Sequence, residues 1–142
     1  MAAITFTDSD VKPGSANAEF APVGVAGAAI SRGQAIYQKT SDGQWYPANA
    51  TDDTKPAAGE SVAISVTSAG IGQTVAYLNN KGAKIDFGAG VLTPTMFYVV
   101  GLSDGAIAPV SDLGAGNALV KLGYASSDSE LIIGAERTGI TQ

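Results

Sequence analysis

Carboxylates are the only side chains in this sequence that could supply acid–base catalysis, because the 142 residues include neither histidine nor cysteine. This composition excludes thiol nucleophiles, Ser-His-Asp triads and zinc sites with Cys or His ligands. Glycoside hydrolysis needs two carboxylates, and Asp52-Asp53 is a candidate pair. The pair lies in a polar stretch that predicts no pocket able to raise the pKa of a catalytic acid. We therefore expect no catalytic residues and a protein that is not an enzyme.

Two acidic runs, Asp8-Ser9-Asp10 and Asp52-Asp53, offer the oxygen ligands that calcium prefers. Neither run has the spacing of a calcium-binding loop. Gly70-Ile71-Gly72 and Gly88-Ala89-Gly90 likewise lack the residues that would continue a phosphate-binding loop. The sequence thus predicts solvated acidic turns and glycine turns, with no metal and no cofactor.

The single tryptophan, Trp45, stands beside Tyr46, and this pair has two interpretations. Together with Tyr124 it could stack on sugar rings. A lone tryptophan is more often an anchor in a core or at an interface, and the sequence favours that role. Trp45 and Tyr46 are therefore candidate interface residues.

Residues 95–101 are apolar on both faces of a predicted strand, because Phe97 and Val99 alternate with other large apolar side chains. Such a strand is either central in its sheet or lies under a subunit contact. Phe97 and Tyr98 are accordingly the other two candidate interface residues.

The formal net charge is −5 and the pI is about 4.4, which argues against binding to nucleic acid, since that requires clustered Lys and Arg. Charged residues make up only 15%, and a low charge suits a surface that partners cover. The longest apolar stretch, residues 23–30, is far shorter than the roughly 20 residues that span a bilayer. The first residues lack the pattern of a signal peptide, so we expect a protein made in a cytoplasm that binds no membrane.

The body of the chain, residues 34–142, reads as short strands between turn signals. In residues 83–87, Ile85 and Phe87 share one face, and in residues 61–67 the apolar residues alternate in the same way, which predicts half-buried strands. Closely spaced short strands predict an all-β fold, a small antiparallel β-barrel or a β-tulip-like sandwich. The predicted strands are 34–39, 44–48, 61–67, 73–79, 83–87, 95–101, 106–110, 118–126 and 129–134.

Three turns should form hairpins. Asp42-Gly43 and Asp104-Gly105 each separate two predicted strands, and glycine supplies the positive φ that such turns need. Residues 79–82 should do the same between strands 73–79 and 83–87. Ser-Asp-Gly, an apolar residue and a proline recur with equal spacing after Ser41 and Ser103, which indicates either convergent turn chemistry or a duplicated hairpin.

Residues 1–33 differ from the body, because they mix single apolar residues with Gly, Ala, Pro, Ser and Asn. We interpret them as an extended N-terminal arm that pairs with a sheet edge, its own or a neighbour's. Ile4, Phe6 and Phe20 would be poor choices for a segment that stays in solvent.

Residues 33–50 and 93–127 carry a resemblance to a known family. The first stretch, GQAIYQKTSDGQWYPANA, resembles the opening repeat of capsid cement or head decoration proteins of tailed phages. The second resembles their most recognisable stretch, in which an aromatic-valine strand leads through a glycine turn into IAPV. The resemblance covers about residues 33 to 134.

The resemblance implies a virion structural protein on the capsid surface. Such proteins sit as homotrimers on the expanded head and clamp neighbouring subunits of the major capsid protein. Their N-terminal arm commonly adds a strand to the capsid, and Ile4, Thr5, Phe6 and Thr7 are the matching segment here. The alternative is a glycan-binding module of a tail or fibre.

Overall fold

The computed structural model describes residues 3–13, 22–52, 54–57 and 59–141, and its regular structure is almost entirely β-strand. This confirms the predicted all-β fold. Short 3-10 turns are present at η1 (Asp8–Asp10) and η3 (Val110–Asp112). The strands of the described residues are β1 (Lys12–Pro13), β2 (Val23–Val25), β3 (Ala35–Gln38), β4 (Trp45–Pro47), β5 (Val62–Ser65), β6 (Thr74–Leu78), β7 (Lys84–Asp86), β8 (Phe97–Val100), β9 (Ile107–Pro109), β10 (Ala118–Ala125) and β11 (Glu130–Thr141).

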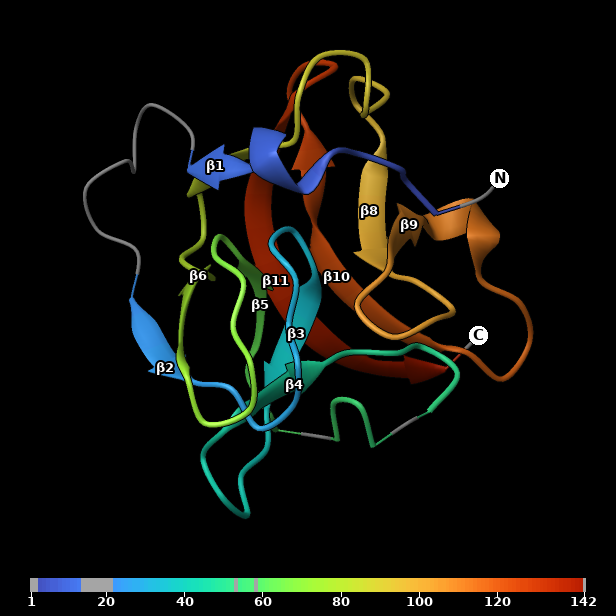
Figure 1. Ribbon diagram of the computed structural model, residues 1–142. Coiled ribbons are helices and arrows are strands. Elements are labelled where there is room, and N and C mark those ends of the chain that lie inside the picture. The colour runs from blue at the N-terminus through green and yellow to red at the C-terminus, as the bar shows by residue number, and fades with distance from the viewer. Residues whose placement is uncertain (1–2, 14–21, 53, 58, 142) are drawn as a thin grey trace.

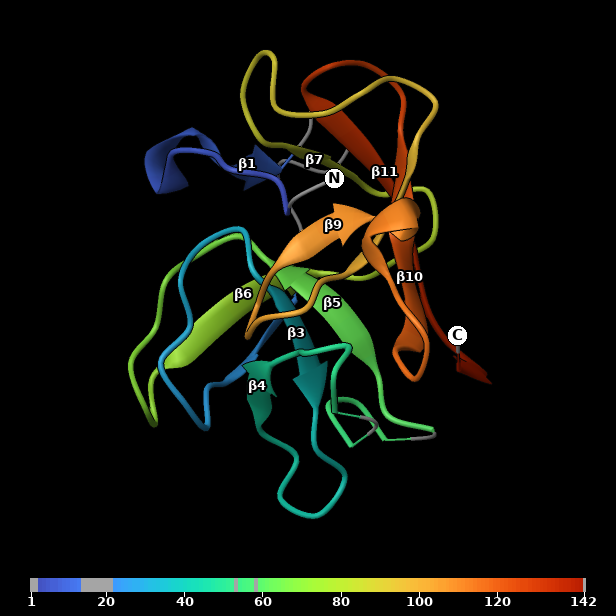
Figure 2. The ribbon, with the colours of Figure 1, turned by 90° about the vertical axis from the view of Figure 1, so that its right-hand side faces the viewer.

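Two antiparallel sheets make up the molecule (Figure 1). The six-stranded sheet has the order β1-β7-β11-β10-β8-β9, and the five-stranded sheet has the order β2-β6-β5-β3-β4. Figure 2 shows β10 and β11 along one side of the molecule and β3, β4, β5 and β6 on the other. All nine strands predicted from the sequence form, and β11 continues to Thr141, beyond its predicted end at residue 134.

Two further strands, β1 and β2, belong to the predicted arm, and both pair with the chain's own body. Lys12 and Pro13 pair with β7, whereas residues 23–25 pair with β6. The arm therefore adds a strand to an edge of each sheet. Phe20 lies outside the described residues.

The main core fills the space between the two sheets. Tyr37 and Ile64 reach it from the five-stranded sheet, and Leu122 and Leu131 reach it from the six-stranded sheet. All four side chains are at least 98% buried. Burial of such apolar surfaces is the main term that stabilises the sandwich.

The prediction that residues 61–67 form a half-buried strand is wrong, because both faces of β5 are buried. Val62 and Ile64 face the main core, and Ala63 faces a second cluster on the other side of the sheet. Ser65 is buried too, and its hydroxyl is satisfied, since it donates to the Ser31 carbonyl at 2.7 Å.

The second cluster exists because the five-stranded sheet curls on itself. A parallel bridge joins Ala26, just after β2, to Trp45 at the start of β4, so that the two outer strands meet. The Gly27 N–H also donates to the Trp45 carbonyl at 2.8 Å. Trp45, Ile36 and Val75 fill the enclosed space. The sheet thus has a barrel-like curvature with an apolar interior of its own.

The turn at residues 79–82 does not make the expected hairpin. It connects β6 to β7, and these strands lie in different sheets. Gly82 has the positive φ that the turn signal predicted, 88°. The local turn chemistry was therefore correct, but it carries no information on which strand becomes the neighbour.

Both Ser-Asp-Gly turns form hairpins, as predicted: residues 41–43 connect β3 to β4, and residues 103–105 connect β8 to β9. The second turn also reaches across to the other sheet. The Gly105 N–H donates to the Ala48 carbonyl at 2.8 Å, and the Gly105 carbonyl accepts from the Ala35 N–H at 3.0 Å. Gly105 thus connects the two sheets through their backbones, and we call this contact the Gly105 joint.

Gly105→Val should destabilise the fold more than Gly43→Val does. Both glycines have positive φ, 77° and 71°, where an L side chain is strained by roughly 1–2 kcal/mol. A Cβ at Gly105 would also lie 2.6 Å from Cδ of Gln34, whereas one at Gly43 meets nothing within 4 Å. Thermal unfolding of both variants tests this, and equal losses in Tm would contradict a special role for the Gly105 joint.

Candidate contact surface

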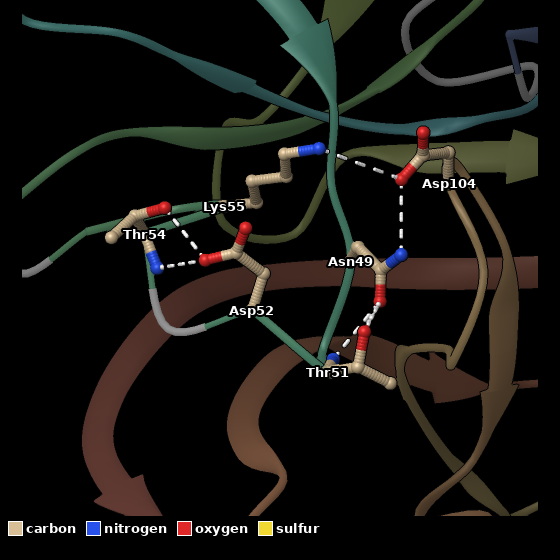
Figure 3. Close-up of polar contacts among 6 residues, drawn as sticks. All are labelled: Asn49, Thr51, Asp52, Thr54, Lys55 and Asp104. Atoms are coloured by element: carbon tan, nitrogen blue, oxygen red, sulfur yellow. Dashed lines mark hydrogen bonds and ion pairs between the residues drawn. The ribbon is translucent and has the colours of Figure 1, made fainter.

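Asp52, the candidate carboxylate for hydrolysis, forms hydrogen bonds within a turn (Figure 3). The Thr54 hydroxyl and backbone N–H donate to Asp52 Oδ1 at 2.6 and 2.9 Å. Both bonds lower the pKa of Asp52 below its usual value, and the bond from the Thr54 hydroxyl has the larger effect. The carboxyl group is therefore ionised near neutral pH, and it has no proton to give as a general acid. Asp53 lies outside the described residues.

Asp104 fastens the loop that follows β4 to the second Ser-Asp-Gly turn (Figure 3). Its Oδ1 accepts from the Asn49 side-chain amide at 3.0 Å and lies 4.0 Å from the Lys55 ammonium. Asn49 in turn accepts from the Thr51 hydroxyl at 2.7 Å. These exposed contacts contribute little energy singly, but they position the loop beside the Gly105 joint.

No three His, Cys, Asp or Glu side chains come together as a metal site within the described ranges. Asp10 and Asp86 line one hollow, and the Lys12 side chain lines it with them. The Asp86 carboxylate accepts from the Gly88 N–H at 2.8 Å. In the described part of the chain, no helix has the length and apolarity that crossing a membrane requires.

Trp45 and Tyr98 belong to the chain's own core, which is the alternative to an interface role that the sequence left open for both. Their exposed fractions are 1% and 2%. The Trp45 ring packs on Tyr77, with 4.3 Å between ring centroids, and the Tyr98 hydroxyl accepts from the Thr93 N–H at 2.9 Å. Both side chains thus anchor the fold itself.

Tyr46 is half-buried and is held by its own chain. Its ring packs against Gly27, where a Cβ would lie 2.3 Å from the tyrosine Cζ, and the Lys39 ammonium lies 4.6 Å from the ring centroid. Its hydroxyl donates to the Asp42 carboxylate at 2.5 Å. The ring is therefore not a free platform for a sugar.

The predicted capsid-contact segment lies along the edge strand β9 and then crosses toward β1 (Figure 1). The Ile4 N–H donates to the Ile107 carbonyl of β9 at 2.9 Å. Ile4 and Phe6 pack against the main core, and the Phe6 ring meets Phe87 edge-on at 5.2 Å. Thr5 and Thr7 are exposed, so they are the side chains of this segment that face outward.

A bulge in β10 determines which aromatic side chains reach the surface. Between Lys121 and Gly123 the register shifts by one residue against each neighbour: β10 has the extra residue relative to β8, and β11 has the extra residue relative to β10. Before the shift, Val120 and Leu122 point inward; after it, Ala125 does, and Tyr124 points outward. Without the bulge, strict alternation would turn Tyr124 into the core.

Gly123 makes this bulge possible. A Cβ on it would lie 2.1 Å from the carbonyl oxygen of Ile132 in the neighbouring strand, which no side chain can tolerate. A glycine within an otherwise apolar strand pattern is a sequence signal for a bulge or a close backbone approach. Residues 118–126 contain this signal, which marks the bulge in the sequence.

The outer face of the six-stranded sheet therefore carries a row of apolar side chains across three strands. Tyr124 of β10 stands opposite Phe97 of β8 and opposite Ile132 of β11. The Phe97 and Tyr124 ring centroids are 6.0 Å apart, and these side chains are 55% and 42% exposed. We call Phe97, Tyr124 and Ile132 the outer row. Exposed neighbouring aromatic rings of this kind mark contact surfaces.

Comparison of the chain with protein-family models, with curated proteins and with solved structures gave no match.

Phe97→Ala and Tyr98→Ala should differ sharply although the residues are adjacent. Phe97 is mostly exposed and loses its ring contact with Tyr124, so we expect a decrease of at most about 1 kcal/mol in the free energy of unfolding. Tyr98 is buried, and its removal leaves a cavity and an unpaired Thr93 N–H, which should cost about 3–5 kcal/mol. Urea denaturation measures both, and a large loss for Phe97→Ala would show that something covers this ring.

Tyr46→Phe should raise the pKa of Asp42. The hydrogen bond from Tyr46 is the largest of the causes that lower this pKa, and the same bond raises the pKa of Tyr46. The bond therefore stabilises the fold above the unfolded pKa of about 3.9, and this contribution is lost as the pH falls through the folded pKa. At the alkaline end the contribution is lost as the pH rises from about 10 through the folded pKa of Tyr46.

NMR titration of the side-chain carboxyl carbons tests this prediction. In Tyr46→Phe the Asp42 pKa should move up toward about 3.9. Asp52 is the internal control, because its pKa is lowered by Thr54 and should stay in place. An Asp42 pKa that does not move would show that the Tyr46 bond does not form in solution.

Proposed function

We propose that this chain is a structural protein of a tailed-phage virion, which binds the outside of the expanded capsid as a homotrimer and clamps neighbouring major capsid subunits. The resemblance of residues 33–134 to capsid cement and head decoration proteins supports the choice of target. Both Ser-Asp-Gly hairpins that contribute to this resemblance are present in the fold. The proposal assigns the chain a role in adhesion and no catalytic step.

One observation supports adhesion above the others, namely the exposed outer row. Phe97 and Tyr124 point away from the core on neighbouring strands, and the bulge at Gly123 is what turns Tyr124 outward. Large exposed aromatic side chains contribute strongly when a partner removes them from water. Three copies in a homotrimer would multiply a modest contact through avidity.

The segment Ile4 to Thr7 can contribute to the same contact without leaving its place. Thr5 and Thr7 are its exposed side chains, and Ile4 joins it to β9, the neighbour of β8, which carries Phe97. A capsid element placed against this edge would meet the arm and the outer row together.

The purified protein should co-sediment with expanded capsids of its phage and not with unexpanded ones. A Phe97→Ser/Tyr124→Ser double variant should bind at least about tenfold more weakly, because the outer row loses its apolar surface. Ile71→Ser is the matched control, since Ile71 is a 77% exposed apolar residue elsewhere on the surface. Failure of the wild-type protein to bind expanded capsids would refute the proposal.

The arm and the oligomer need separate measurements. Thr5→Lys/Thr7→Lys should weaken capsid binding without changing Tm, whereas deleting the arm would also remove Ile4 and Phe6 from the core. Light scattering should give a mass three times the 14.2 kDa of the chain. A mass of one chain would contradict the homotrimer.

The glycan-binding alternative depends on Tyr124, since Trp45 is buried and the Tyr46 ring is occupied. A glycan array with the wild-type protein and Tyr124→Ser decides between the two functions. A signal that the variant loses would favour the tail or fibre module over capsid binding.

A further inference from the structure

The outer row borders a hollow of about 430 Å³ on the six-stranded sheet. Phe97, Tyr124 and Ile132 form its apolar part. Its polar part comes from the turn between β6 and β7, which supplies Asn79 and Lys81, and from β10, which supplies Lys121. The hollow therefore extends over several strands, as a site for an extended chain would.

The described side chains around this hollow differ in charge from the protein as a whole. The chain has a net charge of −5, yet two lysines and no carboxylate are among the described side chains that line the hollow. Glu136, whose side chain is not among those described, pairs with Lys121 in the register. A positive site on an acidic protein selects a partner that is acidic at the point of contact.

Glycines leave the hollow unfilled. Gly134 lies on β11, next but one to Ile132 and on the same face of the strand, and a Cβ placed on it would meet nothing within 4 Å. Its φ is not in the left-handed region, so the backbone does not require glycine there. The open space at Gly134 is thus a property of the surface and not a demand of the fold.

We propose that this hollow binds an extended acidic segment of a partner protein, with an apolar side chain seated on Phe97 and Tyr124 and carboxylates facing Lys81 and Lys121. The inference rests on the proposed function, in which that partner is the major capsid protein.

The first experiment measures binding of a short fluorescent peptide, Glu-Thr-Phe-Thr-Glu-Thr-Phe-Thr-Glu, by anisotropy. A peptide with lysine in place of every glutamate is the control. The acidic peptide should bind, the basic one should not, and affinity should fall about tenfold between about 0.05 M and about 0.5 M salt. Equal binding of both peptides would overturn the proposed charge selection.

The second experiment fills or recharges the hollow. Gly134→Leu and Lys121→Glu should each weaken binding of the acidic peptide at least about tenfold. Gly114→Leu and Lys12→Glu are the matched controls, since Gly114 is another glycine with room for a Cβ and Lys12 is an exposed lysine on β1. Circular dichroism confirms folding, and Lys121→Glu remains a test if Gly134→Leu does not fold.

Capsid binding separates the two levels of the proposal. If the wild-type protein binds expanded capsids and Gly134→Leu binds them equally well, the hollow is not the site, and the proposed function stands. If the wild-type protein binds the acidic peptide but no capsid, the hollow is an acidic-peptide site and the proposed function fails. If Gly134→Leu instead dissociates an oligomer of this chain, a second copy covers the hollow, and the acidic partner is overturned.

Discussion

The backbone hydrogen bonds of Gly105 are the constraint on which the relation between the two sheets depends. Gly105 lies in the β8–β9 turn, yet it bonds to Ala35 and Ala48 of the other sheet. The next loop continues the connection, because Ala50 donates to the Gly101 carbonyl and accepts from the Ala118 N–H. These bonds fix the positions of the β8–β9 hairpin and of the start of β10 relative to the other sheet. The packing of the main core and the position of the outer row both depend on these positions.

A second glycine, Gly123, determines which side chains of the six-stranded sheet are exposed to solvent. At Gly123 the backbone approaches the Ile132 carbonyl so closely that no Cβ fits, and the resulting bulge changes the direction of the side chains that follow. The one-residue register shift at this point therefore places Tyr124 on the surface side of the sheet, beside Phe97. The glycine-rich composition has a positional meaning here: glycines at 105 and 123 set backbone contacts, and the glycine at 134 leaves space.

The sequence predicted the strands well because the period of two and the turn residues are local properties. It could not predict sheet membership at residues 79–82, since a turn signal does not say which strand will pair next. It also could not predict that Ala63 would be covered, because the curling of the five-stranded sheet depends on a long-range bridge between Ala26 and Trp45. The sequence also could not show which face of residues 95–101 is covered: Phe97 is exposed, but its neighbour Tyr98 is buried.

The arm and the outer row are best understood as parts of one edge. An unpaired edge strand is a ready template for other chains, and Ile4 bonds to β9 at such an edge while Phe6 anchors the segment against Phe87. The edge is thereby partly covered from within, which limits unspecific strand pairing. What remains exposed beside it is specific, namely two aromatic rings and a lysine-lined hollow on the adjoining strands. In the proposed contact, side-chain shape and charge would therefore select the partner, and the backbone edge alone would not.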